Sequence, residues 1–260
     1  MRRPLLALLV PAVLAGLLAV SARQPAGGRD DAPLATSPVA TFSILGYDPD
    51  TGEVGGAVQS RVFSVGPAVL FAEADVGVVA TQAVVDVGYG PKALALLRDG
   101  LGPEQVVKKV LEADTDPHPK DWSKEGRQLA VMDAKGKAAA HTGPKASAWA
   151  GDKAGKFCTA QGNILAGPKV VEALVDAFEK TRGHLSFRLL AALEAGQAAG
   201  GDKRGMQSAA MVVVKKGGGV YLNNDTVLRL QVDDNPEPIK ELRRLVEKSA
   251  EWRKRVPSLR

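Results

Sequence analysis

A glycine-rich loop, GGDKRGMQSA (residues 200–209), carries one carboxylate and two cationic side chains and leads straight into an apolar strand. Such a loop can place backbone N–H groups and the carboxylate of Asp202 beside a substrate. The same spacing also fits a helix C-cap followed by a turn, in which Asp202 only shapes the backbone. On spacing alone we favour the turn, so the loop needs further support before it counts as a site.

Other polar groups stand at the ends of apolar runs, where they are often only turn formers. They are His141-Thr142-Gly143 and Gln161-Gly162-Asn163. A G-x-G-x-x-A pattern at 88–93 lacks the acidic residue that a dinucleotide site needs about twenty residues later, so we interpret it as a strand-to-helix turn. The sequence has no G-x-S-x-G elbow and no P-loop. This excludes the common serine hydrolases and the P-loop nucleotide-binding proteins.

The sequence offers few ligands for metals and no partner for a disulfide. Cys158 is the single cysteine, which excludes an internal disulfide and a thiolate metal cluster. The three histidines are far apart and lack the spacing of metal ligands. We therefore expect no metal site and no cofactor.

The net charge of +5 is concentrated at the C-terminal end. Residues 240–260 hold eight Lys or Arg against three Glu, and the stretch 41–239 is slightly acidic. A body without excess positive charge is not expected to bind nucleic acid. We interpret the basic end as the solvated face of a terminal helix, and a tail that docks on an anionic surface is the alternative.

The first forty residues differ in composition from the rest. Residues 1–22 combine two arginines, an apolar run and a small-residue end, which predicts a signal peptide and export to the periplasm or the medium. An uncleaved membrane anchor is the alternative, although Pro11 and Gly16 interrupt the run. Residues 23–40 contain three prolines and no aromatic residue, which indicates a flexible linker or propeptide. One folded domain is expected over 41–260.

Within that domain, blocks of strands alternate with pairs of helices. Short apolar runs separated by turn signals predict hairpins over 41–60, 68–85 and 128–142. This order favours antiparallel sheets covered by helices over a parallel sheet, and the predicted fold class is α+β. The other expected elements are strands at 157–163, 207–215 and 227–234, and helices at 91–99, 103–113, 169–181, 185–199 and 239–252.

Five segments are specific when taken together. They occur in order over residues 40–214 and read ATFSILGYDPDTGEVGGAVQSR, GVVATQAVVDVGYGPKALALLRDGL, AAHTGPKASAWAG, QGNILAGP and GQAAGGDKRGMQSAAMVVV. The pattern closely resembles a bacterial and archaeal family of Ntn-hydrolase-like proteins, domain of unknown function family 1028, over about residues 41–250. The resemblance implies the four-layer αββα sandwich of the N-terminal-nucleophile (Ntn) hydrolases, with two antiparallel sheets face to face. The order of predicted elements agrees with it independently.

The resemblance also implies a nucleophile. In that superfamily the first residue of the mature chain is Thr, Ser or Cys, and its own α-amine is part of the base. Thr41 matches this position, because TFSI opens the domain. The amine exists only if the bond between Ala40 and Thr41 is cut, since a peptide nitrogen is not basic. A free α-amine has a pKa of about 7.7–8.0, so part of it is unprotonated near pH 7.

The segment VGGAVQSR resembles the second strand of proteasome subunits. Ser60 and Arg61 match that strand, whereas Gln59 stands in place of an aspartate. Proteasome subunits also place a lysine beside the nucleophile, and Arg61 cannot take its role because an arginine does not accept a proton. Arg61 could instead lower the pKa of the α-amine by repulsion.

The remaining expected site residues come from the other shared segments. Asp202 and Ser208 resemble, by residue type and order, the superfamily's Asp and Ser pair near the nucleophile. Asp202 is then expected to orient the nucleophile or the substrate. The other residues expected to support the site or bind substrate are Thr81, Gln82 and Asn163.

The expected function is hydrolysis of an amide bond in a small or peptide-like substrate by an exported protein. The alternative is a non-catalytic, peptidoglycan-related binding protein of the cell envelope, in which Thr41 merely begins an edge strand. Some members of the resembling family carry an appended peptidoglycan-binding module, which suits either function. We expect no nucleic-acid partner and membrane contact only through residues 1–22, and a homo-oligomer is left open.

Overall fold

The computed structural model describes residues 41–147 and 149–256, so the predicted signal peptide and linker lie outside the described residues. The chain divides into two units, and every described element lies in the second, Thr36–Arg260. The strands are β1 Thr41–Asp48, β2 Glu53–Ser60, β3 Leu70–Glu73, β4 Gly77–Ala83, β5 Arg127–Asp133, β6 Ala138–Thr142, β7 Ala150–Gly155, β8 Cys158–Asn163, β9 Ser208–Val214 and β10 Thr226–Val232. The helices are α1 Val65–Val69, α2 Tyr89–Arg98, α3 Pro103–Glu112, α4 Lys169–Lys180, α5 Leu185–Ala198 and α6 Pro238–Arg255, with a 3₁₀ turn at Lys124–Gly126.

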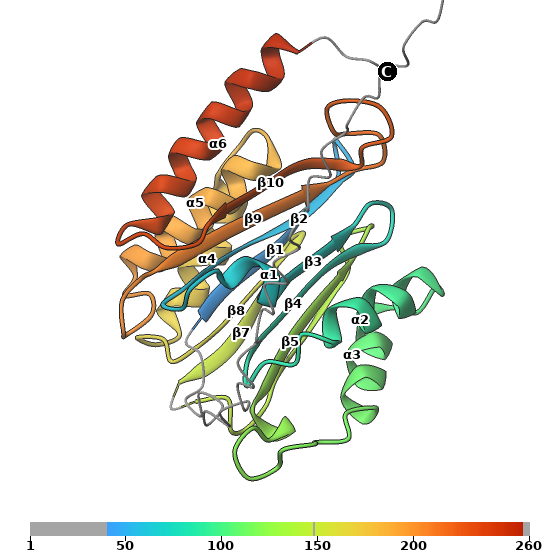
Figure 1. The fold of residues 1–260 in the computed structure, drawn as a ribbon, viewed down its shortest axis with the longest axis vertical. Helices are drawn as coiled ribbons and strands as arrows, with labels where there is room; N and C mark the ends of the chain where they lie inside the picture. Colours follow the sequence, from blue (N-terminus) through green and yellow to red (C-terminus); the bar gives the residue numbers. More distant parts are fainter. Residues whose placement is uncertain (1–40, 148, 257–260) are drawn as a thin grey trace, which may run out of the picture. The chain divides into compact units, whose positions relative to one another are not determined.

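Two antiparallel sheets pack face to face (Figure 1). The larger has the order β10-β9-β2-β1-β8-β7, and the smaller has the order β3-β4-β5-β6. Alternate residues of each strand point to the same face, and those on the inner faces form one apolar cluster that includes Leu45, Val58 and Met132. Apolar side chains therefore fill the space between the sheets along this part of the strands.

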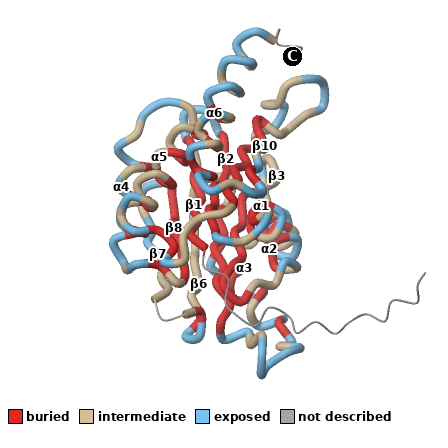
Figure 2. The backbone as a smooth tube through the Cα atoms, turned by 60° about the vertical axis from the view of Figure 1, so that its left-hand side comes forward, coloured by how far each residue is buried: buried red, intermediate tan, exposed pale blue. Residues whose placement is uncertain are grey.

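Helices cover the outer face of each sheet. On the larger sheet, Phe42 and Ile44 of β1 pack with buried residues of α4 and α5, and α6 lies beside α5 over β9 and β10. On the smaller sheet, Val79 and Leu129 pack with residues of α2 and α3. Figure 2 shows the buried residues running along the strands, with exposed residues on the outer sides of the helices. The predicted α+β class with αββα layers and two antiparallel sheets is confirmed.

The sequence patterns located most elements. The three predicted hairpins and all five predicted helices are confirmed to within a few residues. Three elements were not predicted: α1, which has five residues, the 3₁₀ turn at Lys124–Gly126, and β7, whose sequence AGDKAG has no apolar alternation. The alternative view of Thr41 as the start of an edge strand is wrong, because β1 lies between β2 and β8.

The basic C-terminal helix is partly neutralised by acidic neighbours. Arg243 forms ion pairs with Glu194 of α5 and with Glu247, and Arg244 pairs with Glu241. These pairs suit the solvated helix face expected for this segment. Over residues 41–147 and 149–256, no helix is long and apolar enough to cross a membrane.

Candidate functional site

Four polar side chains lie in one row across the end of the larger sheet. Strand register pairs Thr41 with Ser60 on one side and Asn163 on the other, and Ser60 with Ser208. Residues directly opposite each other point to the same face of a sheet, so all four side chains lie on one face. All four side chains are buried. Four of the residues expected from the sequence are thus brought together at one place.

Thr41 heads the central strand of this sheet. Its hydroxyl donates a hydrogen bond of 3.1 Å to Ser60 Oγ, and its carbonyl accepts one of 3.4 Å from Gln82 Nε2. Thr41 has no exposed surface in the uncut chain. A substrate can therefore reach the hydroxyl only after this end of the strand is uncovered.

A chain of hydrogen bonds joins the two sheets beside Thr41. Ser43, two residues along β1 and on the same face, donates to Gln82 Oε1 at 2.7 Å and accepts from Gln161 Nε2 at 2.5 Å. Gln82 Nε2 donates in turn to Gln128 Oε1 at 2.8 Å. The apolar packing between the sheets thus gives way to a buried polar network at the Thr41 end.

Backbone carbonyls fix the orientation of the side-chain amides in this network. Gln128 Nε2 donates to the carbonyl oxygens of Gly162 and Gly151, at 3.0 Å and 3.2 Å, and a carbonyl oxygen can only accept. Gln128 Oε1 must therefore face its other neighbours, Gln82 and Asn163, and both must turn their amide nitrogens toward it. This leaves the buried oxygens Asn163 Oδ1 and Gln161 Oε1 without a donor among the described residues.

The two unmatched oxygens indicate what would complete the site. A buried polar atom without a partner is costly, and such atoms in folded proteins usually meet a ligand or an ordered water. Both atoms here are acceptors. The group that lies beside them must therefore be a hydrogen-bond donor, such as water or the amide N–H, hydroxyl or ammonium group of a ligand.

Replacing Gln82 with methionine is expected to destabilise the domain by about 1–3 kcal/mol. The change keeps the size of the side chain but leaves Ser43 and Gln128 without their buried partner. Chemical denaturation measures the loss. The matched control is Thr81→Val on the same strand, which removes one hydrogen bond on the opposite face. A Gln82→Met protein as stable as wild type would show that the network does not hold the sheets together.

Among the described residues that contact Thr41, no side chain is suited to act as the base that activates its hydroxyl. The groups of the network are hydroxyls and amides, apart from the carboxylate of Asp152, which accepts from Thr142 Oγ1. Among the described residues, no group of three or more His, Cys, Asp or Glu could hold a metal ion. Burial raises the pKa of the Cys158 thiol to about 12, so this thiol is not a nucleophile near neutral pH. The base that the site can supply is the α-amine of Thr41 itself.

The glycine-rich loop lies against this end of the sheet but is held by its own side chains. The buried carboxylate of Asp202 accepts hydrogen bonds from the backbone N–H and the guanidinium of Arg204, the shortest at 2.8 Å. The exposed Arg61 donates to the carbonyl of Arg204, and Gln59 Nε2 donates to the carbonyl of Gly205. Asp202 makes no hydrogen bond to Thr41, so its orienting role stays a prediction.

Two other expected site residues form hydrogen bonds to backbone groups outside the network. Ser208 Oγ donates to the carbonyl of Val62 at 2.5 Å and accepts from the backbone N–H of Val65, so it fixes the segment that precedes α1. Thr81 lies opposite Leu129 in register and shares its face, which packs against α2 and α3. Its hydroxyl donates to the carbonyl of Asp86. Thr81 therefore points away from the network.

A protein-family model matches most of the chain. The model for the family of unknown function DUF1028 matches residues 41–242. The chain belongs to the DUF1028 family. The match begins at Thr41, where β1 begins, and extends to the first turns of α6.

A solved structure agrees with the membership of this DUF1028 chain. The crystal structure of the DUF1028 protein SPO2555 from Silicibacter pomeroyi is 35% identical and has a TM-score of 0.73, over 85% of this chain and 92% of that one. Anbu, an ancestral beta-subunit from Yersinia bercovieri, is 11% identical with a TM-score of 0.35, over 84% and 99% of the two chains. At that TM-score the likeness to Anbu carries no argument. No curated protein matches this DUF1028 chain.

Sequence reasoning missed Ser43 and Gln128 in this DUF1028 site, and took Gln161 for a turn former. A signal was present in the spacing. Thr41 and Ser43 are two residues apart, as are Gln161 and Asn163, and each pair stands in a run that is otherwise small or apolar. Polar residues two apart in a strand share one face, so each pair indicates a local polar patch.

Proposed function

We propose that this protein is an exported Ntn-hydrolase-like enzyme that hydrolyses an amide bond in a small or peptide-like substrate, with Thr41 as its N-terminal nucleophile. One observation carries the proposal. Thr41 heads the central strand beside a buried polar network that has unmatched acceptors and no side-chain base. A threonine in this setting becomes reactive only through its own α-amine, which cutting of the Ala40–Thr41 bond releases.

The proposed reaction has two halves. Thr41 Oγ1 attacks the carbonyl carbon of the substrate amide, and the hydroxyl proton passes to the α-amine. The C–N bond then breaks as the leaving nitrogen takes that proton, which gives an ester on Thr41 and a free amine. Water attacks the ester with the α-amine again as base, and it releases a carboxylic acid and restores Thr41.

The unmatched acceptors limit which substrates can bind. Asn163 Oδ1 lies in the same row as Thr41, and Gln161 Oε1 lies one row further along the same face. An amide substrate brings N–H donors that can satisfy such oxygens, whereas a carboxylate on that side brings only acceptors. We therefore expect substrates that are uncharged or cationic near the scissile bond.

An electrophilic amide analogue tests the nucleophile directly. The protein from its native compartment is incubated with the analogue, and mass spectrometry of its peptides locates the adduct. The proposal expects a single adduct on the peptide that begins with Thr41. Labelling at another residue would transfer the nucleophile role to that residue, and no labelling of a chain that does begin at Thr41 would favour the alternative below.

A non-catalytic, peptidoglycan-related binding protein of the cell envelope is the second candidate. It is favoured by the complete burial of Thr41 in the uncut chain, which keeps the hydroxyl from substrate. In that case the polar network serves only to bind a ligand or to fix the two sheets. Binding without turnover by a chain that retains residues before Thr41 is the result that would favour this function.

Export is proposed from residues 1–22. Cell fractionation is expected to find the protein in the periplasm, in the medium or on the envelope. Edman sequencing of the same fraction reads the mature N-terminus. A full-length product in the cytoplasm that retains Met1 would contradict export.

A further inference from the structure

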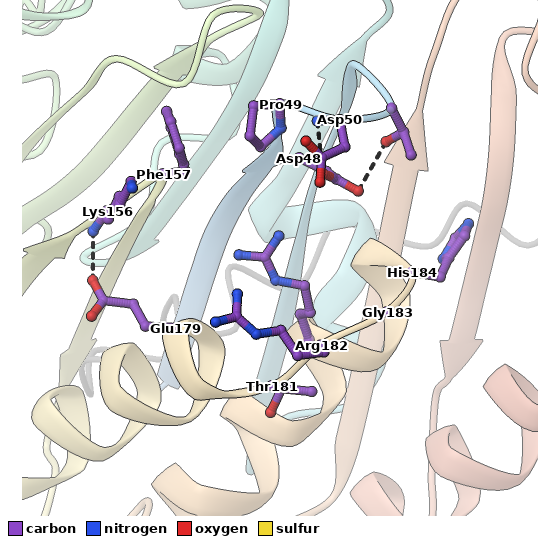
Figure 3. A pocket seen from close by; sticks show the side chains of 12 residues that line it. Asp48, Pro49, Asp50, Lys156, Phe157, Glu179, Thr181, Arg182, Gly183 and His184 are labelled. Carbon is purple, nitrogen blue, oxygen red and sulfur yellow. Dashed lines mark hydrogen bonds between the residues drawn. The ribbon is translucent and has the colours of Figure 1, made fainter.

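A cavity lies at the opposite end of the β1 strand from Thr41. It holds about 590 Å³, in the range of pockets that bind small molecules. Three connections form its walls: the β1–β2 turn, the β7–β8 turn and the link between α4 and α5 (Figure 3). Since β1 has eight residues, the cavity is about 24 Å from Thr41 and forms a separate place in the fold.

The cations of this cavity have no acidic partner among the described residues. Arg182, Arg188 and Lys156 line it, and none of them forms an ion pair there, although three carboxylates line the same cavity. Arg182 also makes no hydrogen bond within that part of the chain. Arg188 lies with its guanidinium carbon 4.1 Å from the centre of the Phe178 ring, while its Nε makes a long contact of 3.5 Å with the Phe178 carbonyl.

Two of the three carboxylates are occupied by other donors. Asp48 accepts from the backbone N–H of Asp50 and from the hydroxyl of Thr51, which shapes the hairpin turn. Glu179 accepts from the backbone N–H of Lys156 at 2.6 Å, as Figure 3 shows. These two carboxylates therefore already accept hydrogen bonds from the walls, and the third, Asp50, is exposed to solvent, which leaves the guanidinium groups available to a ligand.

The geometry favours an anion with two or more oxygens. A guanidinium presents parallel N–H groups that match a carboxylate or a phosphate. The Phe178 ring lies against the guanidinium of Arg188 and holds it in place. The 14-residue helix α5 begins at Leu185, directly after His184, which lines the same cavity, and the N-terminus of a helix also favours an anion. We propose that this cavity binds a small organic oxyanion, a carboxylate or a phosphate ester, through Arg182 and Arg188.

Calorimetric titration with inorganic phosphate and, separately, with succinate tests the proposal on the purified full chain at low ionic strength. Saturable binding of at least one probe is expected, and the probe that binds more tightly identifies the class of oxyanion. Arg182→Gln and Arg188→Gln should each weaken that binding about tenfold or more. Because Arg182 is exposed and has no partner in the described part of the chain, its replacement is not expected to disturb folding.

The matched control is Arg229→Gln, an exposed arginine of β10 that does not line this cavity. It should bind the probes as wild type does. Binding that is absent for both probes, or that is equal in wild type and Arg182→Gln, would overturn the proposal. So would an equal loss in Arg229→Gln, because that would indicate attraction by the overall charge rather than by this cavity.

Discussion

Replacing Thr41 with alanine is expected to lower amide hydrolysis by a thousandfold or more, to the level of the background reaction. The change removes the attacking oxygen while leaving the strand that carries it. Its cost in folding free energy is expected to be about 1–2 kcal/mol, for the lost methyl group and the hydrogen bond to Ser60. Turnover of an amide substrate and a thermal melt of the same preparation measure the two effects.

Thr41→Ser is the matched control, because serine keeps both a hydroxyl and, after cutting, an α-amine. It should retain measurable turnover and accept the same electrophile. If the protein cuts itself before Thr41, the alanine variant should also remain uncut, whereas the serine variant should be processed. Full activity in Thr41→Ala would remove the nucleophile role and leave the network as a binding site.

The largest expected effect on stability belongs to a buried ion pair away from this site. Asp114 and Arg127 are joined at 3.0 Å, and their side chains are only 2% and 3% exposed. Arg127 also donates to the carbonyls of Val84 and Trp122, and the hydroxyl of Tyr89 donates to Asp114 at 2.5 Å. The pair thus joins α2, β5 and the loops before and after α2 and α3. Because breaking it leaves an unpaired buried charge, Asp114→Asn should cost about 3–5 kcal/mol.

The control for this prediction is the exposed ion pair between Glu73 and Arg98, whose side chains are 38% and 55% exposed. Glu73→Gln should cost about 1 kcal/mol or less, because water already solvates both groups. Melting temperatures of both variants compare the two costs. An Asp114→Asn protein that melts within a degree of wild type would show that the buried pair adds nothing to stability.

The same pair predicts a dependence on pH. Burial alone would raise the pKa of Asp114, but hydrogen bonds from Tyr89, the Asp116 backbone and Arg127 outweigh it, so the pKa is lowered. A carboxyl whose pKa is lower in the folded state stabilises the fold above its unfolded pKa of about 3.9. This stability is lost as pH falls through the folded pKa. The difference between wild type and Asp114→Asn should therefore be full at pH 7 and shrink below about pH 4.

The fold could be predicted because its elements carry strong local patterns. Alternating apolar residues separated by turn residues marked the hairpins, and apolar residues at helical spacing marked α2 to α6. The strand β7 could not be found in this way, because AGDKAG has no apolar face and pairs with β8 through its backbone at the sheet edge. Helix α1 is too short to show a period.

The site was predicted in part, and the misses have one physical cause. The shared segment that begins GVVATQAVV brought in both Thr81 and Gln82, although neighbours in a strand point to opposite faces. Only the pairing of strands shows that Gln82 reaches Ser43 while Thr81 faces the helices. Gln128 was missed because its role depends on contacts with two strands distant in sequence, which a single strand does not show.

The intact mass of protein isolated from its native compartment tests the central claim most directly. No described side chain that contacts Thr41 is suited to act as its base, so a nucleophilic Thr41 needs its own α-amine and therefore a cut between Ala40 and Thr41. The expected result is a mature chain whose first residue is Thr41, with the mass of residues 41–260. A mature chain that begins upstream, at Arg23 for instance, would keep Thr41 inside a peptide bond and contradict its role as nucleophile.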